Sequence, residues 1–165
     1  MDIARNLFDT LKSLCTLLSE AHINYCLIGG LAVAILAKPR ATEDIDLLIL
    51  IEEKDRSSIS ELMKKKFEII QDNNIMRFEN ATIWRTILGS PTGDEAGFVI
   101  VDFLLADKEI YREAVLHPLN LTIDYVTIPV ATPENLIKIK ELSNRPQDLL
   151  DIAALKSSNL IGDSH

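Results

Sequence analysis

The stretch from Tyr25 to Ile51, YCLIGGLAVAILAKPRATEDIDLLILI, decides the fold. It predicts a strand over Tyr25–Ile28, then a glycine pair, a short apolar helix, a basic turn, and a second strand that opens with Asp44-Ile45-Asp46. Side chains two positions apart on a strand point to the same face of the sheet. We therefore expect Asp44 and Asp46 to project together, while Ile45 points into the core.

A pair of carboxylates on one strand needs a partner. At a separation of about 4 Å and an effective dielectric constant near 20, two such charges repel by about 4 kcal/mol. The fold can hold both only if a cation lies between them or one carboxylate keeps its proton. A divalent metal is the simplest explanation, so Asp44 and Asp46 are candidate metal ligands.

The glycine pair Gly29-Gly30 completes a candidate phosphate site. Without side chains the backbone can approach a phosphate closely, and the helix that follows offers free N–H groups to an anion. The alternative is a tight junction between strand and helix that requires small residues for packing alone.

A third carboxylate, Asp102, interrupts the apolar run Phe98–Leu105. Burying a lone carboxylate is costly unless it is paired, protonated or bound to metal. The alternative is that Asp102 faces solvent on a sheet covered on one side only. Three carboxylates that converge from two strands would suit a two-metal site for phosphoryl transfer.

Composition excludes several classes of protein. The net charge of −8 argues against a general nucleic-acid binder but not against a polyphosphate ligand, since metal ions and a few lysines can reverse the field in a cleft. Cys15 and Cys26 form no CxxC or zinc pattern and indicate a reducing, cytoplasmic environment. The longest uncharged run, Ile23–Ala37, is too short to span a membrane, so we expect no membrane association.

The periodicity along the chain predicts an α/β organisation in one domain, residues 1–165. We expect four helices: a first that ends near residues 22–24, a second over 56–66, a third that starts at the capping residues Thr132-Pro133, and a last over 147–156. Beyond the opening stretch, we expect strands over 75–79, 82–88, 98–105 and 121–129, the last as one strand or two short ones. A turn is expected over 71–74 and a loop over 89–97.

The order of these motifs resembles the nucleotidyltransferase superfamily typified by DNA polymerase beta. Its signature is a glycine pair at a helix start, a D-x-D on the next strand and a third aspartate on a later strand. The segments Pro39–Leu47 and Arg145–Ile152 are similar to the minimal bacterial members, which include abortive-infection toxins of toxin–antitoxin systems. Gln147 stands where that group usually has lysine.

The resemblance implies a nucleotidyltransferase core, α/β (α+β), with a mixed sheet of about five strands and helices mainly on one face. It also implies a Mg²⁺-dependent enzyme that transfers a nucleoside monophosphate from an NTP to a hydroxyl acceptor. In that role Asp44 and Asp46 would hold two Mg²⁺ ions, and Asp102 would complete the metal site and help to deprotonate the acceptor. Gly29 and Gly30 would bind the β- and γ-phosphates. Lys140, Arg40 and Thr42 would neutralise the triphosphate.

The sequence leaves the acceptor open between a tRNA end, a protein hydroxyl and a small molecule. Acceptor recognition would come from the loops at residues 71–80 and 89–97, from a second copy of the chain, or from a partner protein such as an antitoxin. Two non-enzymatic alternatives are a nucleotide-binding or regulatory module that keeps the fold without turnover, and an interaction module with an unrelated acidic pocket.

Several residues have a purely structural alternative. Arg40 could pair with Glu43 or Asp44, and Lys140 could lie on an exposed helix face. We expect Arg145, Asp148 and Asp151 to be structural, with Arg145 or Lys140 tying two helices together. Trp84 and Arg85 suit either an acceptor pocket or a half-buried strand.

Overall fold

The computed structural model describes residues 3–89 and 97–158. Its strands are β1 (Tyr25–Ile28), β2 (Asp44–Ile49), β3 (Ile69–Asp72), β4 (Met76–Arg77), β5 (Thr82–Gly89), β6 (Phe98–Leu105), β7 (Leu119–Ile123) and β8 (Val126–Val130). Its helices are α1 (Ile3–Glu20), α2 (Gly29–Leu36), α3 (Arg56–Met63, after the 3₁₀ turn Glu53–Asp55), α4 (Glu109–Leu116), α5 (Pro133–Ser143) and α6 (Pro146–Lys156).

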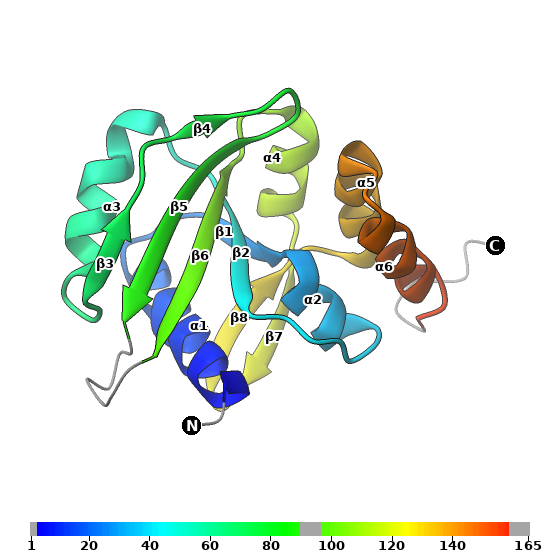
Figure 1. Ribbon diagram of the computed structural model, residues 1–165, viewed down its shortest axis with the longest axis horizontal. Helices are drawn as coiled ribbons and strands as arrows, with labels where there is room; N and C mark the ends of the chain where they lie inside the picture. Colours follow the sequence, from blue (N-terminus) through cyan, green and yellow to red (C-terminus); the bar gives the residue numbers. More distant parts are fainter. Residues whose placement is uncertain (1–2, 90–96, 159–165) are drawn as a thin grey trace.

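The strands form one mixed sheet in the order β3-β5-β6-β2-β1-β8-β7, with β4 paired to β5 (Figure 1). At its centre, β2 runs antiparallel to β1 and parallel to β6. Strand β5 lies antiparallel on the far side of β6. The two strands that carry the expected catalytic carboxylates are therefore direct neighbours.

One face of the sheet is covered by α1, which packs on β2, β6 and β8. Its side chains from the central strands are fully buried and include Ile45, Leu47, Trp84 and Phe103. On the opposite face α4 covers only part of β1 and β2, where the Cys26 thiol donates to the carbonyl of Ala114 at 3.6 Å. The rest of that face holds the aspartates.

Helices α5 and α6 pack against each other beside α4 and α2, at the right of Figure 1. Helix α5 begins as expected, because the Thr132 hydroxyl accepts a hydrogen bond from the Asn135 amide and Pro133 occupies the first position. Asn144 ends it in the left-handed conformation, and Pro146 begins α6. This pair brings its polar side chains to the glycine turn.

The structure confirms the predicted fold class and corrects its details. Among the described residues the sheet has eight strands rather than about five, and β7 and β8 match the alternative of two short strands expected over 121–129. The turn expected over Gln71–Asn74 overlaps β3, because Asp72 is stabilised there by hydrogen bonds from Ser60 and Trp84. Helix α4 was not anticipated, and most of the expected loop at 89–97 lies outside the described residues. Among the residues that the structure describes, no helix is both long and apolar enough to cross a membrane.

Candidate active site

Three aspartates gather on the uncovered face of the sheet. Asp46 on β2 lies directly opposite Asp102 on β6 in the parallel register. Asp44 precedes Asp46 by two positions and projects from the same face. The predicted convergence of carboxylates from two neighbouring strands is thus present in the backbone register itself.

The cluster is electrostatically unfavourable for its charged form. Burial, followed by the nearby charges of Asp102 and Asp44, raises the pKa of Asp46 to about 7. Burial and the Asp102 charge also raise the pKa of Asp44. Such shifts gather at functional sites, where the fold holds charges that a ligand later compensates.

In the part of the chain that the structure describes, Asp102 alone among the three aspartates has an ion-pair partner. Arg85 stands opposite it on β5, and its Nε and one Nη each donate to a carboxylate oxygen at 2.8 Å. The Asp102 side chain is 14% exposed and that of Arg85 is 40% exposed. The hydrogen bonds and charge of Asp102 raise the pKa of Arg85. A forked guanidinium–carboxylate pair of this kind is strong and directional.

The aspartates fit a divalent metal by donor type, because Mg²⁺ prefers carboxylate oxygens. In the arrangement described for residues 3–89 and 97–158, however, no three His, Cys, Asp or Glu side chains are grouped so that they could hold an ion. Both oxygens of Asp102 accept hydrogen bonds from Arg85. Asp44 and Asp46 stay candidate ligands, and Asp102 would have to release Arg85 to join them.

The glycine pair lies against this cluster. Gly29 has a φ of +73°, a conformation that side chains other than glycine rarely adopt. A side-chain carbon at Gly29 would overlap the carboxylate of Asp46, and one at Gly30 would overlap the guanidinium of Arg40. Gly29 is therefore required by its backbone conformation and by the close approach of Asp46, whereas a side chain at Gly30 would displace the flexible end of Arg40.

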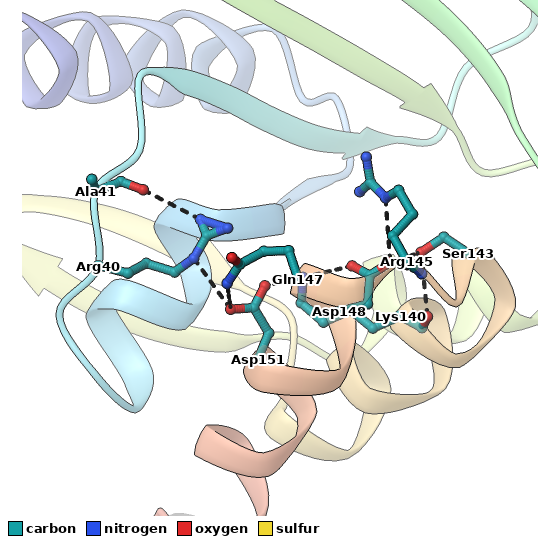
Figure 2. A network of polar contacts seen from close by, with 8 residues as sticks. All are labelled: Arg40, Ala41, Lys140, Ser143, Arg145, Gln147, Asp148 and Asp151. Atoms are coloured by element: carbon teal, nitrogen blue, oxygen red, sulfur yellow. Dashed lines mark hydrogen bonds and ion pairs between the residues drawn. The ribbon is translucent and has the colours of Figure 1, made fainter.

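Arg40 reaches this helix start from the loop that follows α2 (Figure 2). It pairs with Asp151 on α6, Nε to Oδ1 at 3.2 Å, rather than with Glu43 or Asp44, the partners considered from the sequence. Thr42 is partly buried beside it and donates to the Asp44 carbonyl at 3.4 Å. Both candidate residues thus border the glycine turn.

Lys140 is buried, with 7% of its surface exposed, so the exposed-face alternative is wrong. Its Nζ lies 2.9 Å from Asp151 Oδ2 and 3.6 Å from Asp148 Oδ1. Of the two residues expected to tie the helices together, Arg145 or Lys140, it is Lys140 that links α5 to α6 through both carboxylates. Gln147 also donates to Asp151, at 3.1 Å.

Asp148 is held from several sides at the start of α6. It accepts from the Ser143 hydroxyl at 2.6 Å and from the Arg145 backbone at 2.9 Å, and Arg145 Nε lies 3.3 Å away. Burial alone would raise the pKa of Asp148, but these donors and the charges of Arg145 and Lys140 lower it. Asp148 caps its helix as well as pairing with a lysine.

Trp84 and Arg85 separate across the sheet. Adjacent residues of a strand point to opposite faces, so only Arg85 reaches the aspartates. Trp84 is fully buried on the other face, where its ring stacks on Phe103 at 4.7 Å and its N–H donates to Asp72 at 2.7 Å. The acceptor-pocket interpretation therefore does not apply to Trp84.

Two hollows border the aspartates. A polar hollow of about 430 Å³ lies between the glycine turn, the loop at 40–44, α5 and α6. A smaller one of about 200 Å³ lies between the aspartates, α4 and α5. Sequence reasoning identified much of the lining of the first hollow, but not the apolar residues of the second, because ordinary core-type leucines and isoleucines carry no local signal of a cavity.

Solved structures share this fold. The chain is similar to an antigenic nucleotidyltransferase-like protein from Paracoccidioides brasiliensis, with 23% identity, a TM-score of 0.65, and coverage of 92% of this chain and 75% of that one. It is also similar to JHP933 from Helicobacter pylori, with 15% identity, a TM-score of 0.55, and coverage of 92% and 65% respectively. A third likeness, to ANT(2″)-Ia in complex with adenylyl-2″-tobramycin, has 12% identity, a TM-score of 0.51, and coverage of 86% and 83%.

No match was found among curated proteins. The sequence does match a protein family over residues 13–164, nearly the whole chain, and that family is described as "Nucleotidyl transferase AbiEii toxin, Type IV TA system". The match includes the glycine pair, all three aspartates and the α5–α6 network. The chain therefore belongs to the AbiEii nucleotidyl transferase toxin family.

Proposed function

We propose that this protein transfers a nucleoside monophosphate from an NTP to a hydroxyl acceptor, with Mg²⁺, and releases pyrophosphate. The observation that carries the proposal is the register of Asp46 against Asp102 on neighbouring parallel strands, beside a glycine turn that opens a helix. Membership of a nucleotidyl transferase family supports the same chemistry.

Each side chain has a role that follows from its position. Asp44 and Asp46 would hold two Mg²⁺ ions, which supply electrostatic stabilisation of the attacking and leaving oxygens when bound. Asp102, once released from Arg85, would accept the proton of the acceptor hydroxyl. The amides of Gly29 and Gly30 would bind the β- and γ-phosphates, with Arg40, Thr42 and Lys140 around them.

The charges around the polar hollow support a role for metal in binding as well as in chemistry. Three basic side chains line it, against five acidic ones: Arg40, Lys140 and Arg145, against Glu43, Asp44, Asp46, Asp148 and Asp151. A free triphosphate would meet a net negative surface. Mg²⁺ reverses that balance, so we expect the nucleotide to bind as its magnesium complex.

The acceptor class stays within the alternatives of a tRNA end, a protein hydroxyl and a small molecule. By its family the protein is proposed to act as the toxin of a toxin–antitoxin pair, in the cytoplasm, with an antitoxin protein as its partner or a second copy in a homodimer. The Arg85–Asp102 pair favours one competing function, a nucleotide-binding module without turnover, because it neutralises the third carboxylate.

The test combines binding with transfer. Melting should shift upward with NTP plus Mg²⁺ more than with either alone; ligand at a hundredfold excess over its dissociation constant stabilises the folded state by about 2.7 kcal/mol. Lysate fractions incubated with α-³²P-labelled NTPs should acquire label in RNA, protein or small molecules with the wild type and not with Asp102→Asn. Asp124→Asn, a matched change at an exposed acid in the β7–β8 turn, should behave as wild type. A melting shift without any transfer would support the non-catalytic module, and no shift at millimolar NTP would refute nucleotide binding.

A further inference from the structure

The two hollows beside the aspartates share part of their lining. Both are lined by Gly29, Asp46, Lys140, Arg145 and Asp148, so they share one border that includes the glycine turn and the central aspartate. The polar hollow, here called the polar arm, extends from this border toward the loop at residues 40–44 and α6. The smaller hollow, here called the apolar arm, extends toward α4 and the turn between β4 and β5.

The lining of the second arm is different in kind. Beyond the shared border its walls come from Ile83 and Leu104 of the sheet and from Leu136 and Ile139 of α5. Tyr111 of α4 adds an aromatic ring. Away from the aspartates this arm therefore offers apolar and aromatic surface, as pockets for flat organic groups do.

The wall formed by Tyr111 is fixed in place. Its side chain is 2% exposed, and its hydroxyl donates to the carbonyl of Asn80 in the β4–β5 turn. This contact ties α4 to the turn that closes the arm, and Ala81 lines the arm from that turn. A preformed cavity of this kind binds a rigid group without a large cost of ordering.

We propose that the apolar arm receives the nucleobase of the NTP whose triphosphate occupies the polar arm; this rests on the proposed function. A nucleoside triphosphate has a polyanionic part and a flat, largely apolar part, joined through the ribose. The two hollows differ in the same way, one polar and one largely apolar, and Asp46 lines both. The acceptor then approaches the aspartates from the solvent beside Asp102, where Arg85 is 40% exposed.

The variant Ala81→Leu tests the assignment by filling the apolar arm from its turn. The two probes are NTPs and inorganic tripolyphosphate, each with Mg²⁺, and the readout is affinity by calorimetry. Ala81→Leu should weaken NTP binding by about tenfold or more, because the base is excluded, and leave tripolyphosphate within about twofold. Arg40→Gln should weaken both probes. Ala154→Leu, the same change at a partly buried alanine of a different hollow, should weaken neither.

Three outcomes would overturn the proposal. NTP affinity that is unchanged in Ala81→Leu places the base elsewhere, and a simultaneous loss of acceptor turnover would assign the arm to the acceptor. If a folded variant binds NTP and tripolyphosphate more weakly by the same factor, the two arms do not bind separate parts of the nucleotide. If the wild type binds neither probe, the proposed function itself fails and the base assignment falls with it. Should Ala81→Leu not fold, Leu142→Trp fills the same arm from a position that is 38% exposed.

Discussion

The molecule contains two groups of aspartates that lie side by side around one hollow and differ in how their charges are met. On the helices, Asp148 and Asp151 receive hydrogen bonds and ion pairs from Lys140, Arg40 and their neighbours. On the sheet, within the described residues, Asp102 forms an ion pair with Arg85, whereas Asp44 and Asp46 form none.

The difference appears in the pKa values. The pKa of Asp148 is lowered despite burial, because donors from Ser143 and Arg145 outweigh it. The pKa of Asp46 is raised to about 7 by burial and by its acidic neighbours. A carboxylate that is satisfied within the chain stabilises the fold, whereas one left unsatisfied stores strain that a ligand can relieve.

The largest effect on stability should come from removing the cation shared by Asp148 and Asp151. Lys140→Ala should lower the free energy of unfolding by about 3–5 kcal/mol, because it leaves Asp151 and Asp148 buried without their shared cation. Urea denaturation of the wild type and the variant measures the change. Lys138→Ala, at an exposed position of the same helix, is the control and should cost less than about 0.5 kcal/mol.

A loss below about 1 kcal/mol in Lys140→Ala would contradict the comparison. It would mean that the two aspartates are stabilised by their other donors alone. This expectation differs from what the sequence suggests, since a lysine on a helix is exposed by default.

The next effect concerns Asp102, the aspartate on the sheet that is paired with Arg85. Arg85→Gln frees both oxygens of Asp102, and the third carboxylate can then join Asp44 and Asp46. Mn²⁺ should bind about tenfold more tightly to the nucleotide-free variant, as measured by calorimetry. Arg77→Gln, which removes an exposed arginine paired with Glu53, is the matched control.

A double-mutant cycle separates release of Asp102 from a general change in charge. If Arg85 acts through Asp102, its substitution should have little effect on Mn²⁺ affinity in an Asp102→Asn background. Weaker Mn²⁺ binding in Arg85→Gln would show instead that Arg85 holds Asp102 in its metal-binding position.

A smaller effect separates the members of the sheet group from one another. In EDTA at pH 8, Asp46→Asn should raise the free energy of unfolding by about 1 kcal/mol, because a buried, repelled charge is removed at nearly constant shape. Asp102→Asn should instead lower it by about 1 kcal/mol, because Arg85 loses its charged partner. Denaturant unfolding in EDTA and in Mg²⁺ compares them, and Mg²⁺ should remove the advantage of Asp46→Asn. Destabilisation by both changes in EDTA would mean that both aspartates are structural anchors.

The parts of the site that the sequence predicts are those fixed by local spacing. The strand, glycine turn, helix and D-x-D of residues 25–51 are all found in their expected places. The placement of Asp102 follows from one residue in an apolar strand, and the cap at Thr132 from a familiar pair of residues.

The parts that it does not predict depend on distant partners. Helix α4 has no side-chain cap at Lys108 to mark its start. Strand β3 is largely exposed and exists through its pairing with β5, so alternation gives no signal. The burial of Lys140 depends on the packing of α6, and the pairing of Arg85 depends on the register of β5 with β6.

The smallest expected effect adds a charge to the boundary between the two groups. Gln147 is exposed, lines the polar hollow and donates to Asp151. Gln147→Lys should change the free energy of unfolding by less than about 0.5 kcal/mol, because an exposed ion pair adds little. It should tighten the binding of Mg²⁺–NTP by about two- to threefold, since a fourth cation then borders the triphosphate. Calorimetry at low and high salt measures this, with Gln71→Lys on the exposed strand β3 as the control. A gain that is equal in both variants, or that persists at high salt, would show that the added charge does not act on the polar hollow.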